Sequence, residues 1–221
     1  MRRFYRNIIL LILIITTLNI ISRSDVSKSF CEDFLDYSYT ENDSLIENNI
    51  SLAKKCSEKY HKKPEYLQKI SQIYYSKAIS DYSSDQLIPS VKKLFLALDY
   101  TNEYFSKIET IKSFDYQFRG EIYERLADIY KDINSLKPAA ELYNKALADY
   151  ELSENKEKVL NTLIKTGKLY QYNHIPNIAM IYFEIAEEYE EIPLNLYRKI
   201  IDNKIVTLYE LNDYKSADSI F

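Results

Sequence analysis

The residues that could carry out chemistry in this chain are few and widely separated. The two histidines, His61 and His174, lie far apart at a predicted helix end and a predicted turn, where we interpret them as solvated surface residues. The only glycines are Gly120 and Gly167, so the sequence contains neither a glycine-rich phosphate loop nor a G-x-S-x-G nucleophile elbow. We therefore predict that the protein is not an enzyme, has no catalytic residues and needs no cofactor.

The acidic residues also point away from metal chemistry and from nucleic acids. We interpret the pairs Glu187-Glu188 and Glu190-Glu191 as solvated helix faces, and we predict no metal site. The chain has 33 acidic and 29 basic residues, with a formal net charge of -4. A nucleic-acid partner would require clustered Lys and Arg to neutralise phosphates. We therefore exclude such a partner for this segment.

The two cysteines, Cys31 and Cys56, leave two interpretations open. In an oxidising compartment they would form a disulfide, because the helix pairing described below brings their neighbourhoods together. The alternative is two separate, partly buried thiols. Polar residues separate Cys31 from the preceding apolar run, which argues against lipid attachment at this cysteine.

The first 24 residues have the layout of a secretory signal. Arg2, Arg3 and Arg6 precede an apolar run from Ile8 to Ile21, which Thr16, Thr17 and Asn19 interrupt. The run is shorter than the roughly 20 residues that a bilayer-spanning helix needs. We therefore favour a cleaved signal peptide at 1–24 over a signal anchor. The expected location is exported or membrane-anchored, facing the periplasm or exterior, and the only membrane contact would be through this segment if it is uncut.

A repeat of 40 residues is the most informative feature. Leu126, Ala127, Tyr130, Ala139, Tyr143 and Ala146 recur as Thr166, Gly167, Tyr170, Ala179, Phe183 and Ala186. Five of the six pairs keep the same size class. The pattern resembles the tetratricopeptide repeat (TPR), whose first helix carries a small residue followed by an aromatic and whose second carries Ala, aromatic, Ala.

The residue types of this repeat suit the packing of two antiparallel helices. We expect Ala127 and Gly167 at the closest helix crossings, opposite Ala139 and Ala179 from the second helices. The aromatic members, Tyr130, Tyr143, Tyr170 and Phe183, would fill the space between neighbouring repeats, so that the stack shares one core. Ala146 and Ala186 complete the predicted repeat-packing set.

Weaker copies extend the repeat in both directions. Upstream copies place Tyr74, Ala78, Ser90, Leu94 and Ala97, and before them Phe34, Tyr37, Ile46, Ile50 and Ala53, at similar offsets; Ile205, Leu208, Ala217 and Phe221 begin a copy downstream. All five prolines, Pro64, Pro89, Pro138, Pro176 and Pro193, fall at predicted helix starts or turns. The resemblance implies an all-α, right-handed superhelix (a TPR-like solenoid) of about four and a half helical hairpins over 25–221, incomplete at its C-terminal end. Other helical-pair repeats of 40 to 47 residues remain an alternative.

The resemblance also implies where a partner would bind. First helices of TPR proteins line a concave groove that holds a partner peptide, and matching the repeats gives the groove residues Tyr75, Tyr82, Glu124, Asp128, Lys131, Lys168 and Tyr172. Tyrosine suits such a surface because it offers a large contact area with few rotatable bonds. Packing of these tyrosines between repeats is an equally open interpretation.

Three functional hypotheses follow. The first is a protein-protein interaction scaffold that binds a protein or peptide outside the cytoplasm. The second is the extracytoplasmic input region of a longer membrane-spanning transcriptional regulator or kinase, since leading signals and long tyrosine-rich repeats are similar to those of such regulators. The third is glycan binding, because the segment from Cys31 to Asp36 is faintly similar to the start of mature SusD-type lipoproteins. Oligomeric state and partner identity are not predicted.

Overall fold

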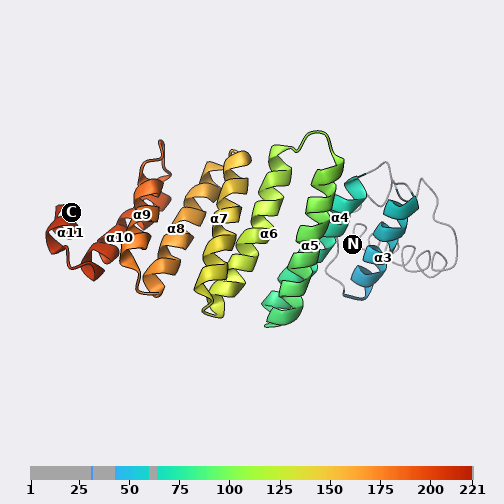
Figure 1. The fold of residues 1–221 in the computed structure, drawn as a ribbon, viewed down its shortest axis with the longest axis horizontal. Helices are drawn as coiled ribbons and strands as arrows, with labels where there is room; N and C mark the ends of the chain where they lie inside the picture. The colour runs from blue at the N-terminus through green and yellow to red at the C-terminus, as the bar shows by residue number, and fades with distance from the viewer. Residues whose placement is uncertain (1–30, 32–42, 60–63, 221) are drawn as a thin grey trace, which may run out of the picture. The chain divides into compact units, whose positions relative to one another are not determined.

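The computed structural model describes Cys31 and residues 43–59 and 64–220 as helices and their connections (Figure 1). The predicted signal at 1–24 and the first helix around Phe34 and Tyr37 lie outside the described residues. The described helices are α3 (Asp43–Lys59), α4 (Glu65–Ser83), α5 (Leu87–Lys107), α6 (Ser113–Asp132), α7 (Leu136–Leu152), α8 (Lys156–Tyr172), α9 (Pro176–Glu187), α10 (Leu194–Glu210) and α11 (Tyr214–Ser219). No strand occurs among these residues.

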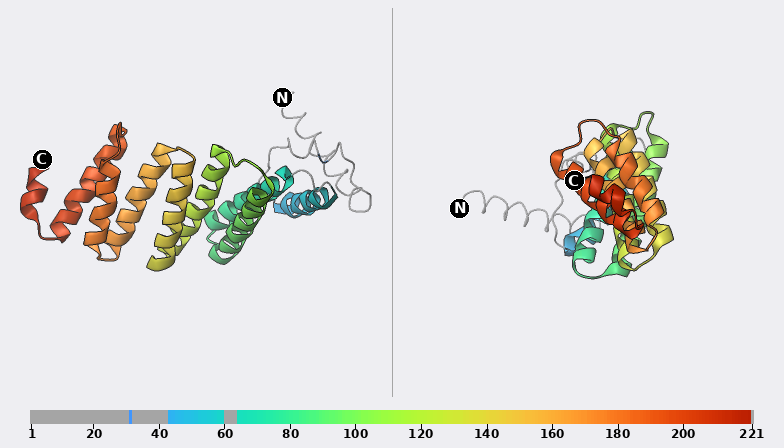
Figure 2. Two further views of the ribbon diagram at one scale, coloured as in Figure 1. Left: turned by 45° about the horizontal axis from the view of Figure 1, so that its top comes forward. Right: turned by 90° about the vertical axis from the view of Figure 1, so that its left-hand side faces the viewer.

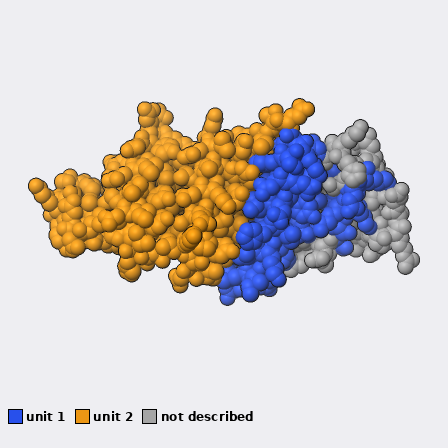
Figure 3. Space-filling view, in the orientation of Figure 1, with its two compact units in different colours: residues 1–108 blue, residues 109–221 orange. Residues whose placement is uncertain are grey.

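These helices belong to two compact units, which Figure 3 colours separately. Unit 1 runs to Ile108 and contains α3, α4 and α5, with α4 packed against both of the others. Unit 2 begins at Glu109, and each of its helices from α6 to α11 packs against the next along the chain. Figures 1 and 2 show that successive helices of unit 2 lie side by side and run in opposite directions. The fold is therefore the predicted all-α stack of helical hairpins, whereas one continuous repeat domain over 25–221 stays a prediction.

The prolines all stand at helix starts, as predicted. Pro64 and Pro193 are the residues that precede α4 and α10, and Pro176 is the first residue of α9. Pro89 and Pro138 lie within the first turns of α5 and α7. At these positions the N–H that proline lacks has no partner within the helix, so the loss costs nothing.

Five turns between helices close with the same motif and without glycine. Asp85, Asn134, Glu154, His174 and Asn212 all adopt a left-handed backbone, with φ between 55° and 60°. In each turn the next N–H donates to the carbonyl five residues earlier, as from Ser135 to Tyr130 (2.8 Å) and from Ile175 to Tyr170 (3.0 Å). This is the Schellman motif, which usually places glycine at the left-handed position. Here Asp, Asn, Glu and His occupy it, which explains how a chain with two glycines makes so many sharp reversals.

The core of unit 2 is shared between hairpins. One cluster of buried side chains comes from four successive helices and contains Ala146, Tyr150, Val159, Leu160, Leu163, Ile164, Ala179, Phe183, Ala186, Leu196 and Ile200. Ala127, Ala139 and Tyr143 are also fully buried, whereas Tyr130 and Tyr170 are half-buried. Since the cluster draws on α7, α8, α9 and α10, no single hairpin encloses it.

Both glycines face an aromatic ring of the second helix in their own hairpin. A Cβ added at Gly167 would lie 2.5 Å from the ring of Phe183, and one added at Gly120 would lie 2.7 Å from the ring of Tyr150. The atoms nearest to a Cβ built at Gly167 therefore belong to Phe183, while the crossing of Gly167 with Ala179 stays a prediction. Because each glycine lacks a Cβ, the aromatic ring occupies the space beside the glycine backbone that a methyl group would otherwise need. Phe183 thus packs within its own hairpin as well as in the shared core.

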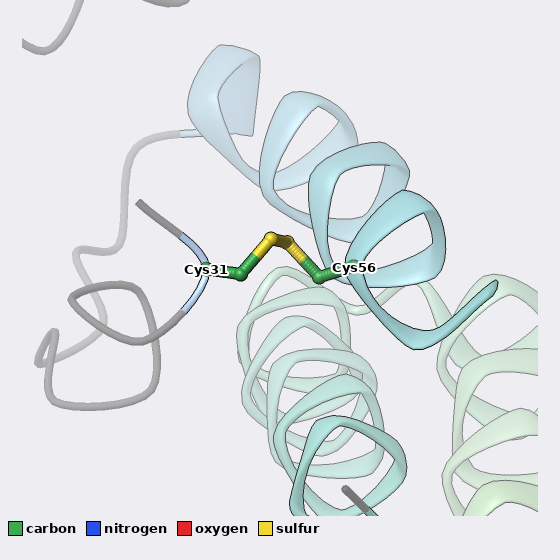
Figure 4. The surroundings of a disulfide bond; sticks show 2 residues. All are labelled: Cys31 and Cys56. Atoms are coloured by element: carbon green, nitrogen blue, oxygen red, sulfur yellow. A yellow bond between two sulfur atoms is a disulfide. The ribbon is translucent and has the colours of Figure 1, made fainter. Parts of the chain in front are cut away.

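A disulfide joins Cys31 to Cys56 of α3, with the two Cα atoms 5.8 Å apart (Figure 4). Both cysteines are fully buried. Of the two interpretations that the sequence left open, the structure contains the bonded form. Among the described residues, none of the helices combines the length and apolar character that crossing a membrane requires.

Candidate functional site

The first candidate site is the face of α6 and α8 that carries Glu124, Asp128, Lys131, Lys165, Lys168 and Tyr172, which we name the first-helix face. Glu124 and Asp128 lie one turn apart on α6, and Lys165 of α8 lies between their carboxylates. The Lys165 Nζ atom is 2.7 Å from Glu124 Oε1 and 3.0 Å from Asp128 Oδ2. One ammonium group therefore joins both carboxylates and ties α6 to α8.

Two tyrosines of α7 reach the same carboxylates from within the fold. The Tyr143 hydroxyl donates to Asp128 Oδ1 and the Tyr150 hydroxyl donates to Glu124 Oε2, each at 2.5 Å. Both residues are fully buried. Their rings belong to the core, while their hydroxyl groups extend to the first-helix face.

Burial and the neighbouring charges shift the pKa values of Glu124, Lys165 and Tyr143 in this network. Burial raises the pKa of Glu124, but Lys165, the Tyr150 hydrogen bond and Lys158 outweigh it, so the net pKa is lowered. Burial lowers the pKa of Lys165, but Asp128 and Glu124 outweigh it and the net pKa is raised. Burial, followed by the nearby Asp128 carboxylate, raises the pKa of Tyr143. At neutral pH the network consequently holds a charged Glu124, a charged Lys165 and a protonated Tyr143.

The predicted groove residues fall into two groups in unit 2. Glu124 and Asp128 are brought together by Lys165, and their side chains are 15% and 14% exposed. Lys131 lies 3.3 Å from Asp132 on the same helix. Lys168 and Tyr172 are one turn apart on α8, and Tyr172 is 70% exposed. The carboxylates are therefore engaged within the protein, whereas Lys168 is half-buried and Tyr172 is exposed to solvent.

The remaining two groove residues, Tyr75 and Tyr82, belong to unit 1. Both lie on α4, are half-buried and interact with other residues of the protein. Their part in partner binding stays a prediction.

Sequence reasoning missed Lys165 and the role of Tyr150. Lys165 does not occupy a position that the TPR pattern assigns to the groove, and its two partners lie about 40 residues earlier. A signal for Tyr150 was present in the sequence. Gly120 lies seven residues before Ala127, and Tyr150 lies seven residues after Tyr143. Because the two helices are antiparallel, both shifts run toward the same end of the hairpin, which predicts a second close crossing two turns away.

The second candidate site is a cleft of about 700 Å³ beside the turn between α7 and α8 and the end of α9. We name it the acidic cleft; its lining residues are Tyr150, Glu151, Glu154, Lys156, Val159, Ile185, Glu188, Tyr189 and Glu190. Burial, followed by the Glu151 carboxylate, raises the pKa of the Tyr189 phenol. Glu188 and Glu190 were predicted on a solvated helix face, but α9 ends at Glu187, so both lie just beyond it and line the cleft.

Neither candidate site brings three potential metal ligands together. Across Cys31, 43–59 and 64–220, no three His, Cys, Asp or Glu residues cluster in a way that could hold one. His174 occupies the left-handed position of a turn, with φ of 57°, and His61 lies outside the described residues.

The comparisons with known proteins bear on the fold. No protein-family model and no curated protein matches this sequence. Among solved structures, BtubC (BKLC) from P. vanneervenii is similar with a TM-score of 0.57 and 18% identity, over 80% of this chain and 77% of that one. The putative kinesin light chain TPR-like repeats of Podosopora anserina are similar with a TM-score of 0.54 and 14% identity, over 82% of this chain and 93% of that one. A point-mutant form of those repeats has a TM-score of 0.53 and 12% identity, over 87% of this chain and 88% of that one. This chain therefore has a TPR-like helical repeat fold.

Proposed function

We propose that this protein is a non-catalytic scaffold that binds a partner protein or peptide on the first-helix face. The observation that carries the proposal is the arrangement on α8, where Lys168 and the 70% exposed Tyr172 lie one turn apart beside a fixed network. Tyrosine provides a large, rigid contact with a hydroxyl group that can pair. The TPR-like fold supports the same function, because stacked helical hairpins present extended binding surfaces.

In this proposal the charged network has a supporting role. Glu124 and Asp128 are satisfied by Lys165 and by two tyrosine hydroxyls, so a partner would gain little by pairing with them. Instead they hold α6 against α8. The partner would contact the more exposed Lys131, Lys168 and Tyr172.

The proposal places the protein outside the cytoplasm, exported or anchored by its N-terminal segment. The Cys31–Cys56 disulfide supports this location, because disulfides persist in oxidising compartments and are rare in the cytosol. Maleimide labelling of the protein, after lysis of its own cells in denaturant, tests it, because unfolding exposes both buried cysteines to the reagent. Both cysteines should resist labelling until a reductant is added, and two freely labelled thiols would contradict the location.

A photo-crosslinking amino acid at position 172 tests the binding surface. In the native cells it should form a defined adduct with a protein, whereas the same amino acid at Glu141, which is exposed on α7, should not. The double change K168E/Y172A should weaken partner binding about tenfold or more, since it removes a large contact and reverses a charge. Equal crosslinking from positions 172 and 141, or undiminished binding by the double variant, would overturn the proposal.

A further inference from the structure

The acidic cleft differs from the first-helix face in where it lies and in how its charges are arranged. Lys156 and Val159 of the cleft lie in the first turn of α8, and Tyr172 is the last residue of the same helix. At 1.5 Å per residue, α8 separates Val159 from Tyr172 by about 20 Å. The cleft and Tyr172 therefore lie at opposite ends of α8, although Tyr150 both lines the cleft and donates to Glu124 of the first-helix face.

The glutamates of the acidic cleft have no cationic partner within the described chain. Glu151, Glu154, Glu188 and Glu190 are all exposed, and none of them forms an ion pair with a described lysine, arginine or histidine. Elsewhere in unit 2, Glu124, Asp149 and Glu187 each pair with a basic side chain. With Lys156 as the single base in its lining, the cleft carries a formal charge of -3.

Apolar and aromatic groups stand between these carboxylates. Tyr150 and Val159 are buried, and Ile185 and Tyr189 are partly exposed. Ile185 also continues a stripe along one face of α9 that includes Ile178 and Ile181, which are 37% and 52% exposed. The cleft thus combines negative charge with an apolar surface against which an aliphatic side chain can pack.

We propose that the acidic cleft binds a basic segment of a partner protein by taking up an arginine side chain. The methylene stem of arginine would pack on Val159 and Ile185, and its planar guanidinium would stack on Tyr189 and pair with the surrounding glutamates. An apolar residue next to the arginine would contact the Ile178–Ile181 stripe. This site is separate from the proposed function of the first-helix face.

A matched pair of fluorescein-labelled peptides tests the inference by fluorescence anisotropy. The first peptide has the sequence Leu-Arg-Ala-Leu-Arg-Arg, and in the second citrulline, a neutral group of the same shape, replaces each arginine. At low salt the arginine peptide should bind at least tenfold more tightly than the citrulline peptide. Methyl NMR signals of Val159 and Ile185 should shift during the titration.

Two quadruple variants with the same change in net charge complete the test. The cleft variant E151Q/E154Q/E188Q/E190Q should weaken binding of the arginine peptide at least tenfold, whereas E58Q/E65Q/E141Q/E210Q, at exposed sites outside the cleft lining, should change binding less than twofold. K168E/Y172A should leave the peptide affinity unchanged, which separates this test from that of the first-helix face. Equal binding of the two peptides, equal effects of the two quadruple variants, or no binding up to millimolar peptide would overturn the inference.

Discussion

The hairpins α6–α7 and α8–α9 solve the same packing problem with different side chains. Tyr143 and Phe183 are equivalent by the 40-residue repeat, and both are fully buried. The Tyr143 hydroxyl reaches Asp128 on the first-helix face, whereas Phe183 has no hydroxyl and its ring lies against Gly167. The comparison separates two roles of an aromatic residue here, because the ring serves packing in both hairpins and only the tyrosine adds a polar connection.

The same difference extends to the way successive first helices are joined. Lys165 links α8 to the carboxylates of α6, but the positions equivalent to Glu124 and Asp128 in α8 are Ile164 and Lys168. Between α8 and α10 the link is neutral, since the Gln171 amide donates to Thr207 Oγ1 (2.7 Å) and to the Asn203 carbonyl (3.0 Å). One contact between repeats should therefore respond to charge and pH, and the next should not.

The largest expected effect comes from Phe183→Ala in the second hairpin. Removing a fully buried ring loses its burial and leaves a cavity, so the free energy of unfolding should fall by about 3 to 5 kcal/mol. Urea denaturation measures this change. A loss under about 1 kcal/mol would show that the ring is not central to the hairpin.

Gly167→Ala in both backgrounds tests the close contact itself. In the natural protein the new methyl group would meet the ring at 2.5 Å, which should destabilise by about 1 to 3 kcal/mol. In Phe183→Ala the obstruction is gone, and the better helix propensity of alanine should make the same change neutral or stabilising. Additive effects of the two changes would contradict the contact.

The next effect in size is that of Lys165→Met, which breaks the network between α6 and α8. It removes the ammonium group that contacts both carboxylates and leaves Glu124 only Lys158, at 4.0 Å; because the Lys165 side chain is 38% exposed, the expected loss is about 1 to 2 kcal/mol. Lys168→Met on the same helix is the matched control and should change stability by less than about 0.5 kcal/mol. Equal effects of the two changes would remove the structural role of the network.

The pH dependence sharpens this test. Because the folded pKa of Glu124 is lowered, its contribution to stability is present above its usual pKa of about 4.3 and is lost as the pH falls through the lower folded value. The difference in stability between the natural protein and Lys165→Met should therefore be largest near pH 7 and shrink below about pH 4. A difference that is constant from pH 7 to pH 3 would contradict the assignment.

Tyr143→Phe makes the first hairpin resemble the second and should have a smaller effect. It removes only the hydrogen bond to Asp128, and Phe183 at the equivalent position shows that the bare ring fits, so the expected loss is about 0.5 to 1.5 kcal/mol. Tyr143→Ala, as the control, should cost several times more. Similar losses for both substitutions would mean that the hydroxyl group contributes most of the stability that this residue provides.

Much of the fold could be predicted from the sequence because its signals are local and repeated. The spacing of Ala127, Tyr143 and their equivalents predicts paired helices, and proline positions mark where helices start. The candidate sites were harder to predict, because they join residues of different repeats. The Lys165 network depends on how far α8 is shifted along α6, and the acidic cleft combines a turn near Glu154 with the end of α9 near Glu188. The periodicity of apolar residues within one helix does not predict how far one helix is shifted along another, or which turn lies beside which helix end.

The smallest expected effect concerns the equivalent turns at Asn134 and His174, and here the substitution should stabilise the protein. Both residues hold a left-handed backbone, with φ of 55° and 57°, but asparagine tolerates this conformation better than histidine does. His174→Gly should therefore raise the free energy of unfolding by up to about 1 kcal/mol, and Asn134→Gly should change it by less than half as much. Thermal and urea denaturation of both variants measure the difference. If His174→Gly destabilised the protein, the histidine side chain would have to contribute contacts that outweigh the backbone strain.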